Sequence, residues 1–150
     1  FDVEDSLSIS ISFHNGALGS VLASDATPAA WSYEAAAGEN PLYFRTYENC
    51  YHFLGTSASL AFPKMDLWSY PDAGRKGWQH PMDRSQITVS AGYPLRIQLE
   101  HFCRVVQGQE EPAITARDGA ESLAVALAVQ QSASRRVPVS PSELLSGVDA

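Results

Sequence analysis

The sequence lacks the features that mark several large classes of protein. Its 150 residues include only two cysteines, Cys50 and Cys103, too few for a disulfide framework, and no apolar run is long enough to span a membrane. No signal peptide pattern opens the chain. Acidic residues outnumber basic ones, and a formal net charge of -7 would repel phosphate backbones and anionic lipid. We therefore expect a cytoplasmic protein that binds neither nucleic acid nor membranes.

The glycine patterns that bind nucleotides are also missing. No glycine stands two positions from another, so there is no G-x-G fingerprint, and neither G-K-[ST] nor G-x-S-x-G occurs. We therefore expect no cofactor to bind this chain alone. Cys50 and His52 would share one strand face, but no third or fourth metal ligand lies nearby in the sequence. A core thiol beside a hydrogen-bonded imidazole is the interpretation we favour, and we expect no metal site.

The first strands of the expected fold carry an unusual row of serines. Apolar residues alternate with serine from residue 6 to residue 13, and Asn15-Gly16 then predicts a two-residue hairpin turn. That turn would pair residues whose numbers sum to 31 and would group on one face Ser8, Ser10, Ser12 and Val21. Such small residues suit packing against another sheet, most simply that of a second copy. A solvated face that merely tolerates serine is the alternative.

The remaining pattern changes from strands to helices. "WSYEAAAG" is interpreted as a resumed strand, residues 50–63 as two strands around Gly55-Thr56, and residues 64–70 as another. Period-3.6 patterns then predict helices from Pro94 to Gly108 and over residues 117–136, the second with a capping box between Asp118 and Glu121. Strands followed by helices predict an α+β fold, with an antiparallel sheet covered by helices on one face.

Several polar and aromatic side chains are candidates for a structural or functional role. His101 is interpreted as a hydrogen-bonded structural histidine, and Glu110 as part of a solvated loop. Trp78 and His80 lie in a connection of about a dozen residues, long enough to suggest a role. Exposed aromatics at a sheet edge often line sugar or nucleotide pockets, although ordinary edge packing is an equal alternative.

Four segments together carry a resemblance to a known family: "FHNGALGSVLASDATPAAWSYEAAAGENP", "CYHFLGTSASLAFPKMDLWSY", "HFCRVVQG" and "ESLAVALAVQQSASRR". Their order and spacing resemble the C-terminal domain of the glucose–fructose oxidoreductase / inositol dehydrogenase (Gfo/Idh/MocA) family of NAD(P)-dependent oxidoreductases. The resemblance implies a glyceraldehyde-3-phosphate dehydrogenase-like C-terminal domain over residues 1–139 and a tail over residues 140–150. It implies a large, open, mostly antiparallel sheet whose free face makes oligomers.

The resemblance also implies where a substrate would bind. The matching segment puts Trp31, Ser32 and Tyr33 on the substrate side. Trp78 and His80 are second candidates, from the character of their loop alone and not from the resemblance. The family's nucleotide-binding glycines and catalytic residues have no counterpart in this sequence, so NAD or NADP would bind elsewhere in the parent protein. Ala58 replaces a glycine that is frequent in the family's hairpin, so we expect that turn to differ in detail.

Three functional hypotheses follow from these observations. The leading one is the substrate-pocket and oligomerisation domain of an oxidoreductase that acts on a sugar, polyol or related hydroxy compound, not catalytic by itself. The second is a non-catalytic carbohydrate-binding or dimerisation module that works alone. The third is a metal-dependent enzyme that uses Cys50, His52 and a further histidine.

Overall fold

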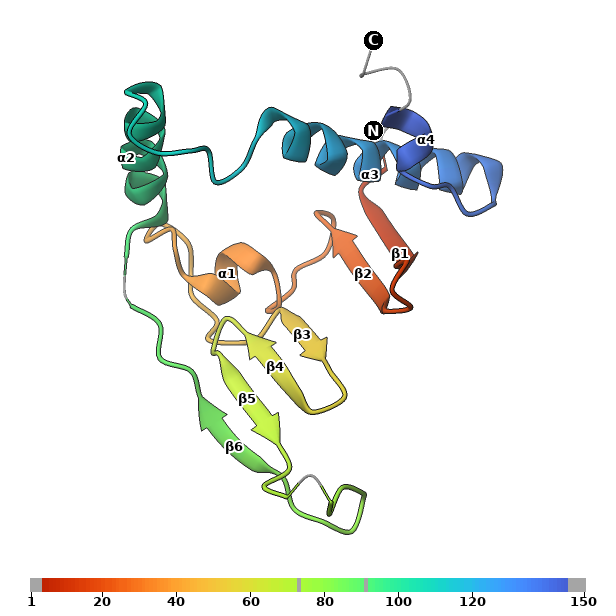
Figure 1. The fold of residues 1–150 in the computed structure, drawn as a ribbon. Helices are drawn as coiled ribbons and strands as arrows, with labels where there is room; N and C mark the ends of the chain where they lie inside the picture. Colours follow the sequence, from red (N-terminus) through yellow and green to blue (C-terminus); the bar gives the residue numbers. More distant parts are fainter. Residues whose placement is uncertain (1–3, 73, 91, 146–150) are drawn as a thin grey trace. The chain divides into compact units, whose positions relative to one another are not determined.

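The computed structural model describes residues 4–72, 74–90 and 92–145 (Figure 1). The outer residues of the predicted domain and tail, 1–3 and 146–150, lie outside this range. The chain divides into two compact units. The hairpin–helix unit contains residues 1–26 and 98–150, and the four-strand unit contains residues 27–97. Among the described residues, no helix is long and apolar enough to cross a membrane.

The hairpin–helix unit begins with β1 (Ser6–Ser12) and β2 (Leu18–Ser24), which pair antiparallel. The predicted hairpin is confirmed, but the predicted register is wrong by one residue. Ile9 lies opposite Val21, and Ser10 opposite Ser20. The turn has three residues instead of two: the Phe13 N–H donates to Ala17 O, the Gly16 N–H donates to Phe13 O, and only Gly16 has positive φ (86°).

The corrected register changes which residues of β2 share a face with the serines. A one-residue slip moves every side chain of one strand to the opposite face. Val21 therefore belongs with Ile9 on the apolar face, and its predicted place beside Ser8, Ser10 and Ser12 is wrong. The face that we call the serine–leucine face consists of Ser6, Ser8, Ser10, Ser12, Leu18, Ser20, Leu22 and Ser24. Every one of these residues is exposed.

The four-strand unit contains an antiparallel sheet in the order β3-β4-β5-β6 (Figure 1). Its strands are β3 (Tyr51–Leu54), β4 (Ala58–Phe62), β5 (Asp66–Ser69) and β6 (Asp83–Gln86). The first three were predicted, whereas β6 was missed because "DRSQ" contains no apolar residue. Ala58 is the first residue of β4, pairs with Ser69 of β5 and has no positive φ. The hairpin therefore accommodates alanine without strain.

The segment predicted to resume a strand is instead a helix, α1 (Tyr33–Ala37). Ser32 is its N-cap, with its Oγ accepting the Ala35 N–H, and Gly38 closes it in the left-handed conformation at φ 66°. Three consecutive alanines between these caps favour a helical turn over a strand. Ser32 and Gly38 are the two signals in the sequence that could have identified this helix.

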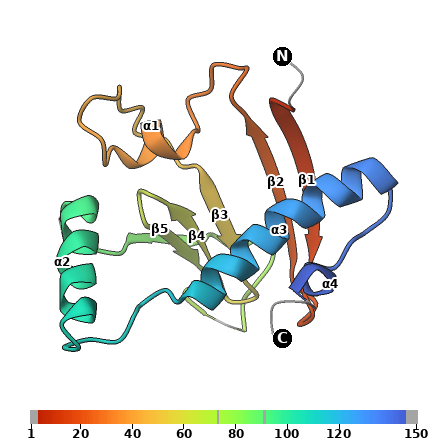
Figure 2. The same cartoon turned by 90° about the horizontal axis from the view of Figure 1, so that it is seen from above.

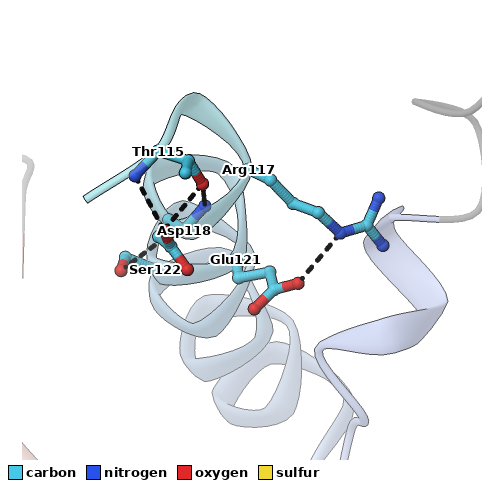
Figure 3. Close-up of polar contacts among 5 residues, drawn as sticks. All are labelled: Thr115, Arg117, Asp118, Glu121 and Ser122. Atoms are coloured by element: carbon cyan, nitrogen blue, oxygen red, sulfur yellow. Dashed lines mark hydrogen bonds and ion pairs between the residues drawn. The ribbon is translucent and has the colours of Figure 1, made fainter. Parts of the chain in front are cut away.

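Three further helices follow the sheet: α2 (Pro94–Val106), α3 (Ala116–Arg135) and α4 (Ser142–Leu145), which contacts α3 (Figure 2). The predicted helices α2 and α3 are confirmed. The predicted capping box is wrong by three residues, because Thr115 is the N-cap and Asp118 is the N3 residue. Figure 3 shows the reciprocal bonds: Asp118 Oδ2 accepts from the Thr115 N–H, and Thr115 Oγ1 accepts from the Asp118 N–H.

Small residues occupy the most buried apolar positions. Among the described residues, the buried hydrophobic ones are Ala36, Ala61, Ala124 and Ala128. Because alanine ends at Cβ, it allows neighbouring backbones to approach closely. The predicted α+β class with antiparallel strands is confirmed, but the strands form sheets of two and four strands in place of one large sheet.

Candidate functional site

The predicted substrate-side segment leads into α1. The Ser32 hydroxyl serves as the helix cap, since its Oγ lies 3.4 Å from the Ala35 nitrogen. Thr46, which follows α1 in the chain, makes two hydrogen bonds to this segment. Its hydroxyl donates to Ala30 O at 2.7 Å, and its backbone N–H donates to Ala35 O at 2.9 Å. Trp31 remains 67% exposed. The structure therefore leaves the indole accessible while it gives the serine hydroxyl a structural role.

Tyr33 packs against the sheet. Its ring stacks on Phe62 with centroids 6.2 Å apart and lies 6.3 Å from the ring of Tyr51. Its hydroxyl donates to Glu39 Oε1 at 2.8 Å, and this bond to a carboxylate, aided by burial, raises the pKa of Tyr33 to about 12. The phenol is therefore protonated at physiological pH, and its O–H is already donated to Glu39. Tyr33 joins α1 to one face of the four-stranded sheet.

Trp78 and His80 lie in the connection between β5 and β6. The Tyr70 hydroxyl and the His80 N–H both donate to the carbonyl of Gly77, at 3.2 and 3.0 Å. Lys76 Nζ donates to Thr56 O at 3.2 Å, which ties the connection to the β3–β4 turn. The Trp78 side chain is fully exposed. These contacts hold residues 76–80 of the connection and leave the Trp78 indole exposed to solvent.

The two groups of predicted substrate residues do not come together. Tyr33 packs on Phe62, the last residue of β4, whereas the Trp78 loop follows Ser69, which pairs with Ala58 at the first residue of β4. Four residues of strand separate these ends by about 13 Å, at roughly 3.3 Å per residue. A single small substrate would therefore contact one group or the other.

A hollow that was not predicted from the sequence lies on the face of the four-stranded sheet that points away from Tyr33. It is half-open, with a volume of about 330 Å³, and its polar and aromatic lining comprises Asn49, His52, Ser59, Lys64, Asp66, Trp68 and Arg84. We call it the β3–β6 hollow. His52 and Asp66 share one cross-strand row, and Trp68 and Arg84 share the next. Alternation along β5 places Asp66 and Trp68 on one face, whereas Arg84 comes from β6, a strand that was not predicted.

Asp66 is the only buried charged residue in the part of the chain that the structure describes. Its Oδ1 accepts from Arg84 Nη2 at 3.0 Å and from Nε at 3.3 Å. The Arg84 guanidinium also lies over the Trp68 ring, 5.5 Å from its centroid. The carboxylate is 8% exposed and the arginine side chain 56%, so a buried acid holds a solvent-facing base in place.

His101 is held as a structural residue, as predicted. Its Nε2 accepts the Ala113 N–H at 3.1 Å, so the ring proton lies on Nδ1 and is donated to Glu110 Oε2 at 2.7 Å. Glu110 also accepts from Arg104 Nε at 2.8 Å. Glu110 lies in an exposed loop after α2, as predicted, and its two bonds in addition link α2 to the loop that precedes α3.

The bonds of Glu110 predict a pH-dependent contribution to stability. Arg104 first and His101 second lower the pKa of the Glu110 carboxyl. Because the folded-state pKa is depressed, this stabilisation is present above the unfolded-state pKa and disappears as the pH falls through the folded-state pKa. We expect Glu110→Gln to lower the melting temperature at neutral pH, with the difference from wild type vanishing in acid. Glu111→Gln is the control, and an equal pH-dependent loss there would contradict the assignment.

The described residues offer no arrangement suited to a metal or a dinucleotide. No group of three or more His, Cys, Asp or Glu among them could hold a metal ion. Cys50 is half-buried, and burial raises the pKa of its thiol, which favours the neutral form. The sheets within the described ranges are antiparallel, and the first turn of α3 already carries the Asp118 carboxylate, which would repel a pyrophosphate.

Comparison with known proteins identifies the family. The family model described as "Oxidoreductase family, C-terminal alpha/beta domain", that of Gfo/Idh/MocA, matches residues 2–140. Searches of curated proteins and of solved structures returned no match. The match spans nearly all of the sequence, and the α+β architecture with antiparallel sheets agrees with it. The chain therefore belongs to the Gfo/Idh/MocA oxidoreductase family, as its C-terminal α/β domain.

Proposed function

We propose that this chain is the substrate-pocket and oligomerisation domain of an NAD(P)-dependent oxidoreductase that acts on a sugar, polyol or related hydroxy compound. The family match over residues 2–140 carries this proposal. The residues described here do not fit a dinucleotide, so we assign nucleotide binding and proton transfer to another domain of the same protein. We also propose a cytoplasmic location, because Cys50 and Cys103 are both free thiols.

The test of this proposal uses the complete protein. We expect the absorbance of a reduced nicotinamide to change when the enzyme receives NAD or NADP together with a polyol, or the reduced cofactor with the matching ketose or aldose. A change that requires both cofactor and substrate would support the proposal. Saturable nucleotide binding without turnover across a panel of sugars, polyols and hydroxy acids would overturn the substrate class.

Trp31 is the best-placed substrate contact among the predicted residues. Ser32 is engaged as a helix cap and Tyr33 is packed against Phe62 and Glu39, whereas the Trp31 ring is exposed and is anchored beside a capped helix. An indole face of this kind suits the apolar face of a sugar ring. The bonds of Thr46 to Ala30 and Ala35 fix the backbone on which the indole is mounted.

Trp31→Ala in the complete enzyme is expected to raise KM about tenfold with a smaller change in kcat, since an aromatic wall contributes mainly to substrate binding. Trp78→Ala is the matched control, because Trp78 is also an exposed tryptophan and lies at the opposite end of the sheet. A raised KM in Trp78→Ala alone would assign the substrate contact to Trp78 in the β5–β6 connection. An unchanged KM in both variants would show that neither tryptophan contacts the substrate.

The serine–leucine face is the proposed oligomer interface. Serine side chains are small and can meet a second sheet closely, and Leu18 and Leu22 on the same face are 81% and 84% exposed. Burying these two leucines against a second copy would remove apolar surface from water. A two-fold arrangement requires only that the face complement itself.

Ser10→Lys tests the interface, because Ser10 pairs with Ser20 at the middle of the hairpin. A lysine there would place a charge between the sheets, and we expect the dissociation constant of the oligomer to rise at least about tenfold. Sedimentation velocity over a range of concentrations would measure this shift. Ser57→Lys, in the exposed β3–β4 turn, is the control. Identical sedimentation profiles for both variants would show that the serine–leucine face is not the oligomer interface.

A further inference from the structure

We propose that the β3–β6 hollow binds a small anionic ligand, a carboxylate or phosphate group on a short carbon skeleton, through Arg84 and Lys64. This site lies on the sheet face opposite Tyr33, and it is independent of the substrate contact proposed for Trp31.

Arg84 is positioned before any ligand arrives. Two of its N–H groups donate to Asp66 Oδ1, and its guanidinium plane is supported by the Trp68 ring at 5.5 Å. A guanidinium has five N–H donors, and the remaining ones donate to no other side chain among the described residues. An arginine fixed by a buried acid and an aromatic ring loses little further side-chain freedom when it binds an anion.

Lys64 is held at the same hollow through its backbone. The Lys64 N–H donates to Asn49 Oδ1 at 3.0 Å, and the Lys64 carbonyl accepts from Gln86 Nε2 at 2.7 Å. These bonds join the β4–β5 turn to the segment before β3 and to the end of β6. The lysine backbone is thereby fixed on the lining of the hollow while its ammonium group makes no ion pair with a described residue.

Charge and size define the class of ligand. Within the lining, Lys64 and Arg84 face one carboxylate, Asp66, so the hollow carries an excess of positive charge in a chain whose net charge is -7. The imidazole of His52 adds a further polar group. Trp68 and Leu54 supply apolar wall for a carbon skeleton. About 330 Å³ is at the small end of ligand pockets, which suits a metabolite-sized acid and excludes a large cofactor.

Binding of inorganic phosphate and of acetate to the complete protein tests the proposal, with chloride at matched ionic strength as the blank. The readout is the Trp68 indole N–H resonance, assigned by its loss in Trp68→Phe. We expect a saturable shift with phosphate, acetate or both, and the anion that responds identifies which group the hollow prefers. Lys64→Gln should weaken that binding about tenfold, because a charge-assisted hydrogen bond is lost.

Two variants complete the design. Arg84→Gln should abolish the shift, and Lys64→Gln keeps the test valid if Arg84→Gln does not fold, because it leaves the Asp66–Arg84 pair intact. Arg75→Gln removes the same charge from an exposed site in the β5–β6 connection and should bind as wild type does. A linear response to both anions, or equal weakening in Lys64→Gln and Arg75→Gln, would overturn the proposal.

Discussion

Phe62→Ala is expected to lower the free energy of unfolding by about 3 kcal/mol, since it removes a large side chain together with two aromatic contacts. Phe62 stacks on Tyr33 at 6.2 Å and meets Tyr51, its cross-strand partner, at 6.0 Å. The substitution would therefore loosen α1 from the four-stranded sheet. Urea denaturation, followed by far-ultraviolet circular dichroism, would measure the change.

Phe44→Ala is the matched control for this prediction. Phe44 belongs to the same unit but is 86% exposed, so its removal should change the free energy of unfolding by less than about 0.5 kcal/mol. Phe62→Leu should fall between the two, because it retains apolar volume while it loses the ring contacts. Equal stability of Phe62→Ala and Phe44→Ala would show that the aromatic cluster does not hold α1 to the sheet.

Arg84→Ala is expected to lower the free energy of unfolding by about 2 kcal/mol. We expect this loss to exceed that of Asp66→Ala, although both variants break the same ion pair. Without Arg84, the Asp66 carboxylate stays buried with no cation to offset its lost hydration. Without Asp66, the guanidinium is already 56% exposed and can be hydrated by water. The difference between the two variants therefore arises from their unequal burial.

A double-mutant cycle measures the coupling between Asp66 and Arg84 directly. Adding Asp66→Ala to Arg84→Ala should restore part of the lost stability, since it removes the uncompensated charge. Chemical denaturation of the four proteins in the cycle would provide the comparison. If Asp66→Ala destabilised the protein more than Arg84→Ala, the buried carboxylate would have a structural role beyond holding the arginine.

The hairpin shows where local pattern was sufficient and where it was not. Alternation between residues 6 and 13 and the Asn15-Gly16 pair correctly predicted two antiparallel strands. The register depended on the number of residues in the turn. Asn15 uses its Oδ1 to accept the Ala17 N–H, and only Gly16 takes positive φ, so the turn gains a third residue. That single residue moved Val21 off the serine face and brought Leu18 and Leu22 onto it.

The candidate site shows a similar division. The sequence pointed to Trp31, Ser32 and Tyr33 through a resemblance, but it could not show that Ser32 caps a helix or that Tyr33 faces Phe62. Both outcomes depend on the Ser32-to-Gly38 caps and on the return of Thr46 to Ala35. The β3–β6 hollow was not predicted, because its charged pair joins β5 to the polar strand β6.

The sequence by itself determined the family, the α+β class, the hairpin and the two long helices, because each is encoded by short-range periodicity, caps or the order of motifs. Only the tertiary structure decided the hairpin register, the division into sheets of two and four strands, and the pairing of Asp66 with Arg84. These features depend on which distant backbone groups pair with one another. Such pairing is set by turn length and cross-strand contacts, which no single stretch of sequence contains.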